Sequence, residues 1–282
     1  MKITGGQHLY YVLRANRLTA AAFAVAIFIF LVAIVGPFIT PYDPLESNVA
    51  SALQPPSALH WFGTDQIGRD VFSRVVVATR LDIFIALSAV ALSFVIGASI
   101  GAMCGYLGGW IDRWISRMVD VLMAFPLFVL AMALVAALGN KVENVIYATM
   151  LINLPFYVRY ARVEVNVQRT RGFVDAARVS GNGDARILFR FLLPNVLPGM
   201  MVQISLNMGW AILNAAGLSF IGLGIRPPAP EWGIMVAEGA RFITTGQWWT
   251  VLFPSLALVA TVLAFNLLGD GLRDIVDPKL RT

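Results

Sequence analysis

Four polar or amphipathic side chains in one apolar stretch have the spacing to act together on a polar solute. They are Gln203, Asn207, Trp210 and Asn214, at offsets of 0, 4, 7 and 11 residues. These offsets place all four on one stripe of an α-helix. Polar groups at membrane depth face a partner helix or a wet cavity, because lipid cannot satisfy their hydrogen bonds. The stripe therefore predicts either hydrogen bonds within a packed bundle or a candidate translocation path, with Trp210 in its wall.

A second group of residues has the character of a docking surface. Asp175-Ala176-Ala177 is followed by Gly181, which is the usual residue type for the left-handed position after a helix. The two alanines add little bulk, so their helix face can seat in a groove of a partner protein. Asp175 offers a carboxylate to a basic group of that partner. We therefore expect a short helix that ends at Gly181 and binds another polypeptide.

The residues after Gly181 predict the other half of a compact knob. Asn182-Gly183-Asp184 is typical of a turn, and Asp184 can cap a second short helix over Ala185–Leu192. Leu193-Pro194 then begins the return of the chain into lipid.

Residues for energy conversion or catalysis do not occur in recognisable patterns. A Walker A loop ends in Gly-Lys-Ser/Thr, and the chain contains no Gly-Lys dipeptide. His8, His60 and the single Cys104 are too scattered to predict a metal or catalytic site. The acids nearest the apolar segments lie at the ends of those segments: Asp82, Asp120 and Asp270. We therefore expect a chain that is not an enzyme, binds no cofactor and obtains its energy from a partner.

The composition shows which solvent these residues need. Of the 282 residues, 58% are hydrophobic and 13% are charged, whereas soluble domains carry about 25% charged residues. This excludes a soluble enzyme, a disordered chain and a disulfide-rich secreted domain. The net charge of +5 fits cytoplasmic loops that collect Lys and Arg, so nucleic acid is not an expected partner.

Apolar segments predict an all-α membrane protein with six transmembrane helices. The first segment is uncharged and too long for the apolar core of a signal peptide, so we interpret it as a retained anchor. The six predicted spans are Leu18–Ile39, Ile83–Leu107, Val119–Leu138, Val145–Tyr160, Val196–Leu223 and Thr250–Leu268.

The distribution of Lys and Arg predicts the orientation. With both termini in the cytoplasm, 15 basic residues lie inside and 6 outside, as the positive-inside rule requires. The expected division is a cytoplasmic N-terminal tail (1–17), an anchor helix (18–40), an extracytoplasmic loop (41–82), a five-helix core (83–268) with a cytoplasmic coupling loop (161–194), and a cytoplasmic C-terminal tail (269–282).

The extracytoplasmic loop carries opposite charges at helical spacing. Asp65 with Arg69, and Asp70 with Arg74, are four residues apart, a spacing that supports a helix. With Thr64 or Asp65 as its cap and apolar residues on another face, the segment predicts a short amphipathic helix on the membrane surface. Such a helix is interpreted either as a lid that shields the bundle or as a contact for solute.

Small residues predict one close helix contact. Gly97, Gly101 and Gly105 recur every four residues, so they share one face on which another backbone can approach. Helix packing is the expected role of this face.

The docking residues resemble a family motif. Permease subunits of bacterial ABC importers carry Glu-Ala-Ala, three residues, Gly, nine residues, and Ile-x-Leu-Pro. Here Asp175-Ala176-Ala177 precedes Gly181 at that spacing, and Phe191-Leu192-Leu193-Pro194 follows. Asp175 and Phe191 replace Glu and Ile but keep their chemical character.

A narrower resemblance extends over nearly the whole chain. The chain is similar to the C-type permeases of dipeptide, oligopeptide and nickel importers through Phe62-Gly63-Thr64-Asp65, Gly68-Arg69-Asp70, Gly217-Leu218-Ser219-Phe220-Ile221-Gly222-Leu223-Gly224, Pro227-Pro228-Ala229-Pro230-Glu231-Trp232-Gly233 and Asn266-Leu267-Leu268-Gly269-Asp270-Gly271-Leu272-Arg273-Asp274.

This resemblance implies a type I ABC importer permease fold in the bacterial inner membrane. It implies a heterodimer with a B-type permease, two ATP-binding subunits that hold ATP and Mg, and an extracytoplasmic solute-binding protein. Alternating access would carry peptides, or alternatively nickel chelates, opines or other peptide-like solutes. A passive channel or a secondary carrier is a more distant alternative, since neither a pore filter nor an ionisable pathway is evident.

Overall fold

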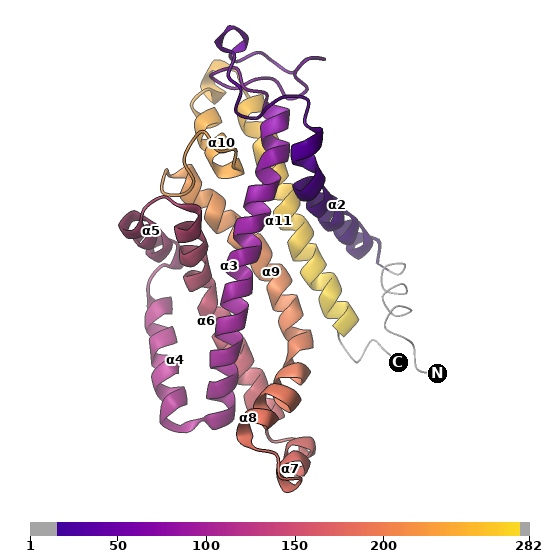
Figure 1. Cartoon of the computed structure of the whole chain (residues 1–282), viewed down its shortest axis with the longest axis vertical. Helices are drawn as coiled ribbons and strands as arrows, with labels where there is room; N and C mark the ends of the chain where they lie inside the picture. Colours follow the sequence, from indigo (N-terminus) through magenta and orange to yellow (C-terminus); the bar gives the residue numbers. More distant parts are fainter. Residues whose placement is uncertain (1–15, 277–282) are drawn as a thin grey trace.

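The computed structural model describes residues 16–276, and long helices dominate this range (Figure 1). The long helices are α2 (Arg17–Ile39), α3 (Val71–Leu107), α4 (Gly109–Ala124), α5 (Leu127–Leu138), α6 (Val142–Gln168), α9 (Leu193–Phe220) and α11 (Trp249–Val276). The short elements are η1 (Val49–Ser51), α7 (Gly172–Val179), α8 (Asp184–Arg186), the π-helical turn η2 (Ile187–Leu192), α10 (Trp232–Ala240) and η3 (Ile243–Thr245). Within the described range, the only β-type pairing is an isolated bridge between Thr64 and Asp70.

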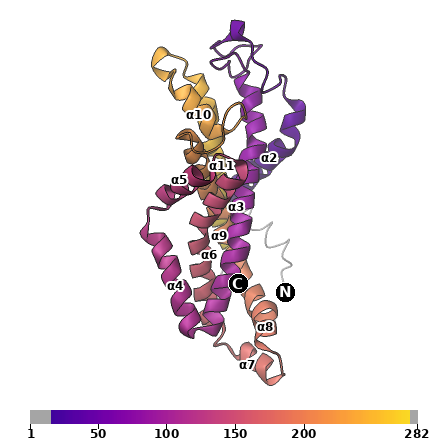
Figure 2. The same ribbon diagram turned by 60° about the vertical axis from the view of Figure 1, so that its left-hand side comes forward.

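Helix α3 forms the centre of the bundle, with α6, α9 and α2 packed against it (Figures 1 and 2). The three glycines predicted to pack closely lie on its face toward α6. A Cβ on Gly101 would lie 2.2 Å from the carbonyl oxygen of Val158, and one on Gly105 would lie 2.5 Å from that of Arg162. At Gly97 it would lie 2.7 Å from the Cβ of Tyr157. Any side chain larger than hydrogen would therefore push α6 away from α3.

The predicted span Val119–Leu138 is not one continuous helix, because the chain bends within it. Helix α4 ends at Ala124, α5 begins at Leu127, and the two helices meet at 88°. Pro126 cannot donate a backbone hydrogen bond and disfavours helical geometry at the residue before it. Phe125 is accordingly extended, with ψ of 145°.

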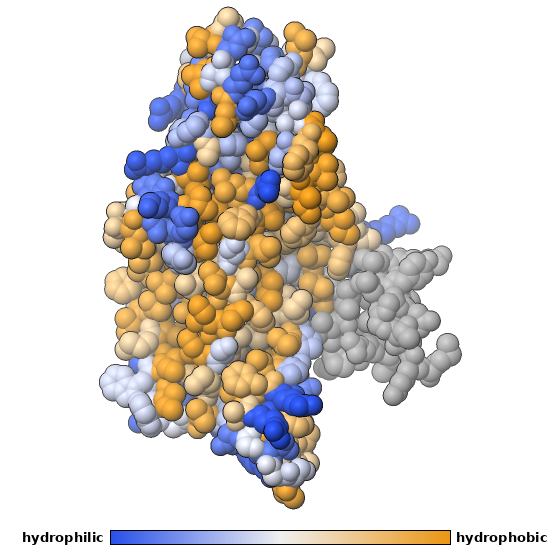
Figure 3. All heavy atoms as spheres, viewed as in Figure 1, coloured by the Kyte–Doolittle hydropathy of each residue, from blue (hydrophilic) through white to orange (hydrophobic). Residues whose placement is uncertain are grey.

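Candidate membrane-crossing helices within residues 16–276 number four or five by length and composition, so six spans stay a prediction. The four are α2, α3, the continuous segment Asp184–Phe220 and α11, and the bent pair of α4 and α5 would be a fifth. Helix α6 covers the predicted span Val145–Tyr160 but carries Arg159 and Arg162, and it is not among them. Figure 3 shows a continuous apolar band across the middle of one face, with hydrophilic residues gathered toward the two ends.

The predicted amphipathic helix around Asp65–Arg74 is also wrong. Helix α3 begins only at Val71, and Asp70 caps it by accepting a 2.8 Å hydrogen bond from the backbone N–H of Ser73. The preceding residues form turns that need glycine. Gly68 has φ of +80°, and a Cβ there would lie 1.8 Å from the carbonyl oxygen of Asn48.

The predicted separate helix Ala185–Leu192 is wrong as well. Residues Asp184–Phe220 run through α8, the π-helical turn η2 and α9 without a break. Gly183, and not Asp184, is the N-cap residue. Pro194 therefore lies inside the first turn of α9 and does not start a new segment.

The first and last described turns lie side by side. A Cβ on Gly271 of α11 would be 2.3 Å from Cγ2 of Thr19 in α2. Helix α11 continues to Val276, so the tail predicted to begin at residue 269 is helical over its first half. The remaining tail residues, 1–15 and 277–282, lie outside the described range.

Candidate functional site

Four of the predicted docking residues, Asp175, Ala176, Ala177 and Gly181, lie in a knob, residues 169–192, at one end of the bundle (Figure 1). Gly181 ends helix α7 as predicted, because its φ of +79° places it in the left-handed region. Its N–H donates to Arg178 at 2.9 Å, and the N–H of Asn182 donates to Ala177 at 3.2 Å. These two bonds satisfy carbonyls that a helix end leaves unpaired. The sharp turn of the knob thus depends on a left-handed residue at position 181.

The exposed face of α7 contains different residues from those predicted for the docking face. Asp175 and Ala176 are exposed, whereas Ala177 is buried against the rest of the chain. The two alanines therefore do not share one docking face. Val179 is 91% exposed and is the most exposed large apolar side chain of the described residues. The Asp175 carboxylate accepts a 3.3 Å hydrogen bond from Arg178 in the same helix turn.

Hydrogen bonds connect the knob to the end of α3. The hydroxyl of Tyr106 donates to Oδ1 of Asp184 at 2.5 Å, and Nη1 of Arg169 donates to the Tyr106 carbonyl at 3.1 Å. Leu193 is half-buried and Pro194 is exposed where α9 begins. A force on the knob would therefore reach both α3 and α9.

The polar stripe of α9 is divided between two environments. Asn207 is buried and accepts a 3.4 Å hydrogen bond from Gln203. Trp210 is 63% exposed, and its carbonyl accepts a 2.8 Å hydrogen bond from the side chain of Asn214. One part of the stripe therefore faces the bundle, and the other part faces away from the described residues. Its role in translocation stays a prediction.

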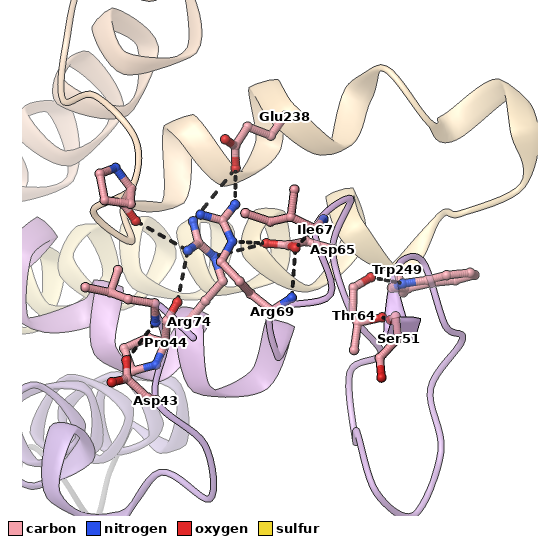
Figure 4. A network of polar contacts seen from close by, with 12 residues as sticks. Asp43, Pro44, Ser51, Thr64, Asp65, Ile67, Arg69, Arg74, Glu238 and Trp249 are labelled. Carbon is pink, nitrogen blue, oxygen red and sulfur yellow. Dashed lines mark hydrogen bonds and ion pairs between the residues drawn. The ribbon is translucent and has the colours of Figure 1, made fainter. Parts of the chain in front are cut away.

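A cluster of four charges, three of them buried, lies at the opposite end of the bundle, called here the α10 end. Figure 4 shows its contacts. The charged cluster consists of Asp65, Arg69, Arg74 and Glu238. Nε of Arg69 lies 2.5 Å from Asp65, and its Nη2 lies 3.1 Å from Glu238. Arg74 lies 3.6 Å from Asp65 and 3.8 Å from Glu238. The side chains of Arg69 and Arg74 are 2% and 1% exposed, so both cations depend on these two acids.

Local turns explain why Asp65 and Arg69 pair without a helix. Oδ1 of Asp65 accepts the backbone N–H groups of Ile67 and Arg69, each at 3.0 Å. Such side-chain bonds are typical of aspartate in turns. The predicted pairing of Asp70 with Arg74 is not formed, since Asp70 contacts His60 at 2.9 Å.

Glu238 was missed because it lies 169 residues after Arg69. No local pattern in the sequence connects the two positions.

Two further acids, Asp82 and Glu231, are buried where the loop before α10 meets α3. The carboxylate of Glu231 caps α10 by accepting from Gly233 at 2.9 Å and Ile234 at 2.8 Å. Asp82 accepts the N–H of Trp232 at 3.2 Å. Burial raises the pKa of Glu231 above its ordinary value, and the two N–H donors oppose this only in part. The pair fixes the start of α10 against α3.

Two ion pairs join α4 to α6 beside a cleft of about 340 Å³. Arg159 lies 2.6 Å from Asp120, and Arg162 binds both carboxylate oxygens of Asp112. Both arginines belong to α6, which continues to Gln168, so Arg162 lies in this helix and not in the coupling loop predicted to begin at residue 161.

Several long apolar helices and a projecting knob are the features of a multi-pass membrane protein. Residues 97–282 match the model of the family described as "Binding-protein-dependent transport system inner membrane component". Residues 7–56 match "N-terminal TM domain of oligopeptide transport permease C". The chain belongs to the family of inner membrane components of binding-protein-dependent transport systems.

Relatives cover almost the whole chain. It is 42% identical over 270 residues to the dipeptide transport system permease protein DppC of Alkalihalophilus pseudofirmus, covering 96% of this chain and 88% of that protein. It is 41% identical over 281 residues to DppC of Escherichia coli K12, covering 98% and 93%. It is 40% identical over 255 residues to the di/tripeptide transport system permease protein DppC of Pseudomonas aeruginosa, covering 88% and 84%.

Proposed function

We propose that this chain is the C-type permease subunit of an ABC importer that carries di- and oligopeptides across the bacterial inner membrane. The family membership supports a permease, and the names of the relatives support a peptide as the solute. In this proposal α6 is a further membrane span, and the N-terminus and the knob face the cytoplasm. The α10 end faces outward, toward a solute-binding protein.

The observation that carries the proposal is the connection from the knob into the long helices. The knob exposes Asp175, Ala176 and Val179 while Tyr106 and Asp184 bind it to α3. Two ATP-binding subunits seated under this permease and a B-type partner would press on the two knobs when ATP closes them. Because α9 continues from the knob without a break, the push would tilt α3 and α9 together and open the path outward. ATP and Mg are held by the partner subunits.

A substitution at Gly181 tests the coupling. Gly181→Asp in the complete transporter, reconstituted in vesicles with its binding protein, should abolish ATP-driven uptake of labelled dialanine and permease-stimulated ATP hydrolysis. A side chain at φ of +79° strains the turn, and the added carboxylate changes the docking face.

Gly246→Asp is the matched control. Gly246 is also exposed, with φ of +96° and open space around it, but it lies at the α10 end. Normal uptake and ATP hydrolysis by Gly181→Asp would contradict the coupling role. Equal losses in both variants would assign the effect to general destabilisation.

A further inference from the structure

A cavity of about 450 Å³ lies at the α10 end, between the end of α9, the loop that follows it and α10. Its volume falls within the range of about 300–1,000 Å³ that is typical of small-molecule sites. Phe220, Ile234 and Phe242 supply apolar lining, and Arg226, Glu238 and Arg241 supply charge. An apolar cavity with a few convergent charged groups suits a solute that is part apolar and part ionised.

The charge of the cavity is positive, because its one acid is already neutralised. Glu238 belongs to the charged cluster, in which two buried arginines balance two acids. Among residues 16–276, neither Arg226 nor Arg241 has a carboxylate within ion-pair distance. These two cations are therefore available to an anionic group in the cavity.

Arg226 is held in place by neutral groups, which leaves most of its donors free. Its Nη2 donates to Oδ1 of Asn140 at 3.2 Å, and the Asn140 amide donates to the Gly222 carbonyl at 2.8 Å. A guanidinium has five N–H donors in a fork that matches a carboxylate. Asn140 thus orients Arg226 without neutralising it.

We propose that this cavity is the site at which the permease first receives a peptide, with the peptide's C-terminal carboxylate on Arg226 and Arg241. The apolar side chains of the peptide lie against Phe220, Ile234 and Phe242. The inference rests on the proposed function, since it places the incoming solute at the outward-facing end. It assigns substrate contact to residues outside the polar stripe of α9.

The test uses the complete transporter in vesicles, with its solute-binding protein saturated with labelled dialanine. The double variant Arg226→Gln, Arg241→Gln should lower the maximal rate of ATP-driven uptake about tenfold, as expected for lost charge-assisted hydrogen bonds. The concentration of loaded binding protein that gives half-maximal uptake should not change. Arg241→Lys should recover part of the rate in the presence of Arg226→Gln, because it restores one charge.

Arg80→Gln is the matched control, since Arg80 is exposed near the same end but does not line the cavity. An unchanged maximal rate in the double variant would overturn the proposal. A rise in the half-maximal concentration of binding protein would also overturn it, because the arginines would then bind that protein. Failure of the unaltered transporter to take up dialanine would contradict the proposed function instead.

Discussion

The charged cluster at the α10 end and the charged pair of the knob differ in burial. At the α10 end, Arg69 and Arg74 are almost completely buried and each contacts two acids. In the knob, Asp175 and Arg178 form one pair and are 67% and 49% exposed. Buried charges hold a loop in one position, because any movement would leave a charge unpaired. Exposed charges are free to exchange their partner, as a docking surface requires.

Removing one acid from the charged cluster should have the largest effect. Asp65→Ala leaves two buried arginines with one acid and removes two hydrogen bonds of the turn. We expect a loss of about 3–5 kcal/mol in the free energy of unfolding, as is typical when one partner of a buried ion pair is removed. Thermal unfolding of the purified protein in detergent measures this loss.

Arg159→Ala provides the comparison, since it breaks a pair that is about half exposed. Its cost should be about 0–1 kcal/mol. Equal losses in the two variants would show that burial does not make the ion pairs of the charged cluster costlier to break than an exposed pair.

Glycine is required at both ends of the bundle, but for different physical reasons. Gly233 lies where α10 contacts α9, and a Cβ there would be 2.1 Å from the carbonyl oxygen of Ala216. Gly233→Ala should therefore destabilise by about 1–3 kcal/mol through overpacking. Gly181 has open space and is required only for its positive φ.

Asparagine makes this distinction measurable, because it tolerates left-handed geometry better than alanine. Gly181→Asn should unfold at a higher temperature than Gly181→Ala, whereas Gly233→Asn should unfold at a lower temperature than Gly233→Ala. The same order at both positions would mean that one cause acts at both ends.

Burial of Glu231 predicts a pH dependence of stability at the α10 end. The folded state raises the pKa of Glu231, so the stabilisation that this residue contributes is fully present below its unfolded pKa of about 4.3. It is lost as pH rises through the folded-state pKa. Glu231→Gln cannot ionise and loses one acceptor, at a cost of about 1 kcal/mol at low pH.

The advantage of the unaltered protein over Glu231→Gln should therefore shrink between pH 5 and pH 8, as read from thermal unfolding midpoints. An advantage that stays constant or grows would contradict the assignment of a raised pKa to this group.

Local chemistry explains which parts of the fold were predictable. Gly181 predicted the end of α7, and long uncharged apolar runs predicted α2 and α11. Both signals are local, because each depends only on neighbouring residues in the sequence. Asp65 and Arg69 were correctly paired but wrongly placed in a helix. A spacing of four residues also fits a turn. The turn is favoured here because Gly68 packs against the carbonyl group of Asn48, a contact that the local sequence does not reveal.

Long-range contacts explain what the sequence could not reveal. Glu238 completes the charged cluster from another helix, and burial of Ala177 depends on how the knob packs against the bundle. The bend between α4 and α5 has a local cause instead. Pro126 disfavours helical geometry at Phe125, but the prediction of one span followed the apolar character of the segment.

The smallest effect on stability should occur at the exposed charge pair of the knob. Asp175→Asn removes an exposed pair with Arg178, so its free energy of unfolding should change by less than about 0.5 kcal/mol. ATP-driven uptake in vesicles should nevertheless fall, because the carboxylate is proposed to bind a basic group of the ATP-binding subunit. Asp175→Glu should retain uptake, and Glu46→Gln, an exposed acid at the α10 end, should leave both quantities unchanged. Full uptake by Asp175→Asn would show that this exposed carboxylate does not bind the ATP-binding subunit.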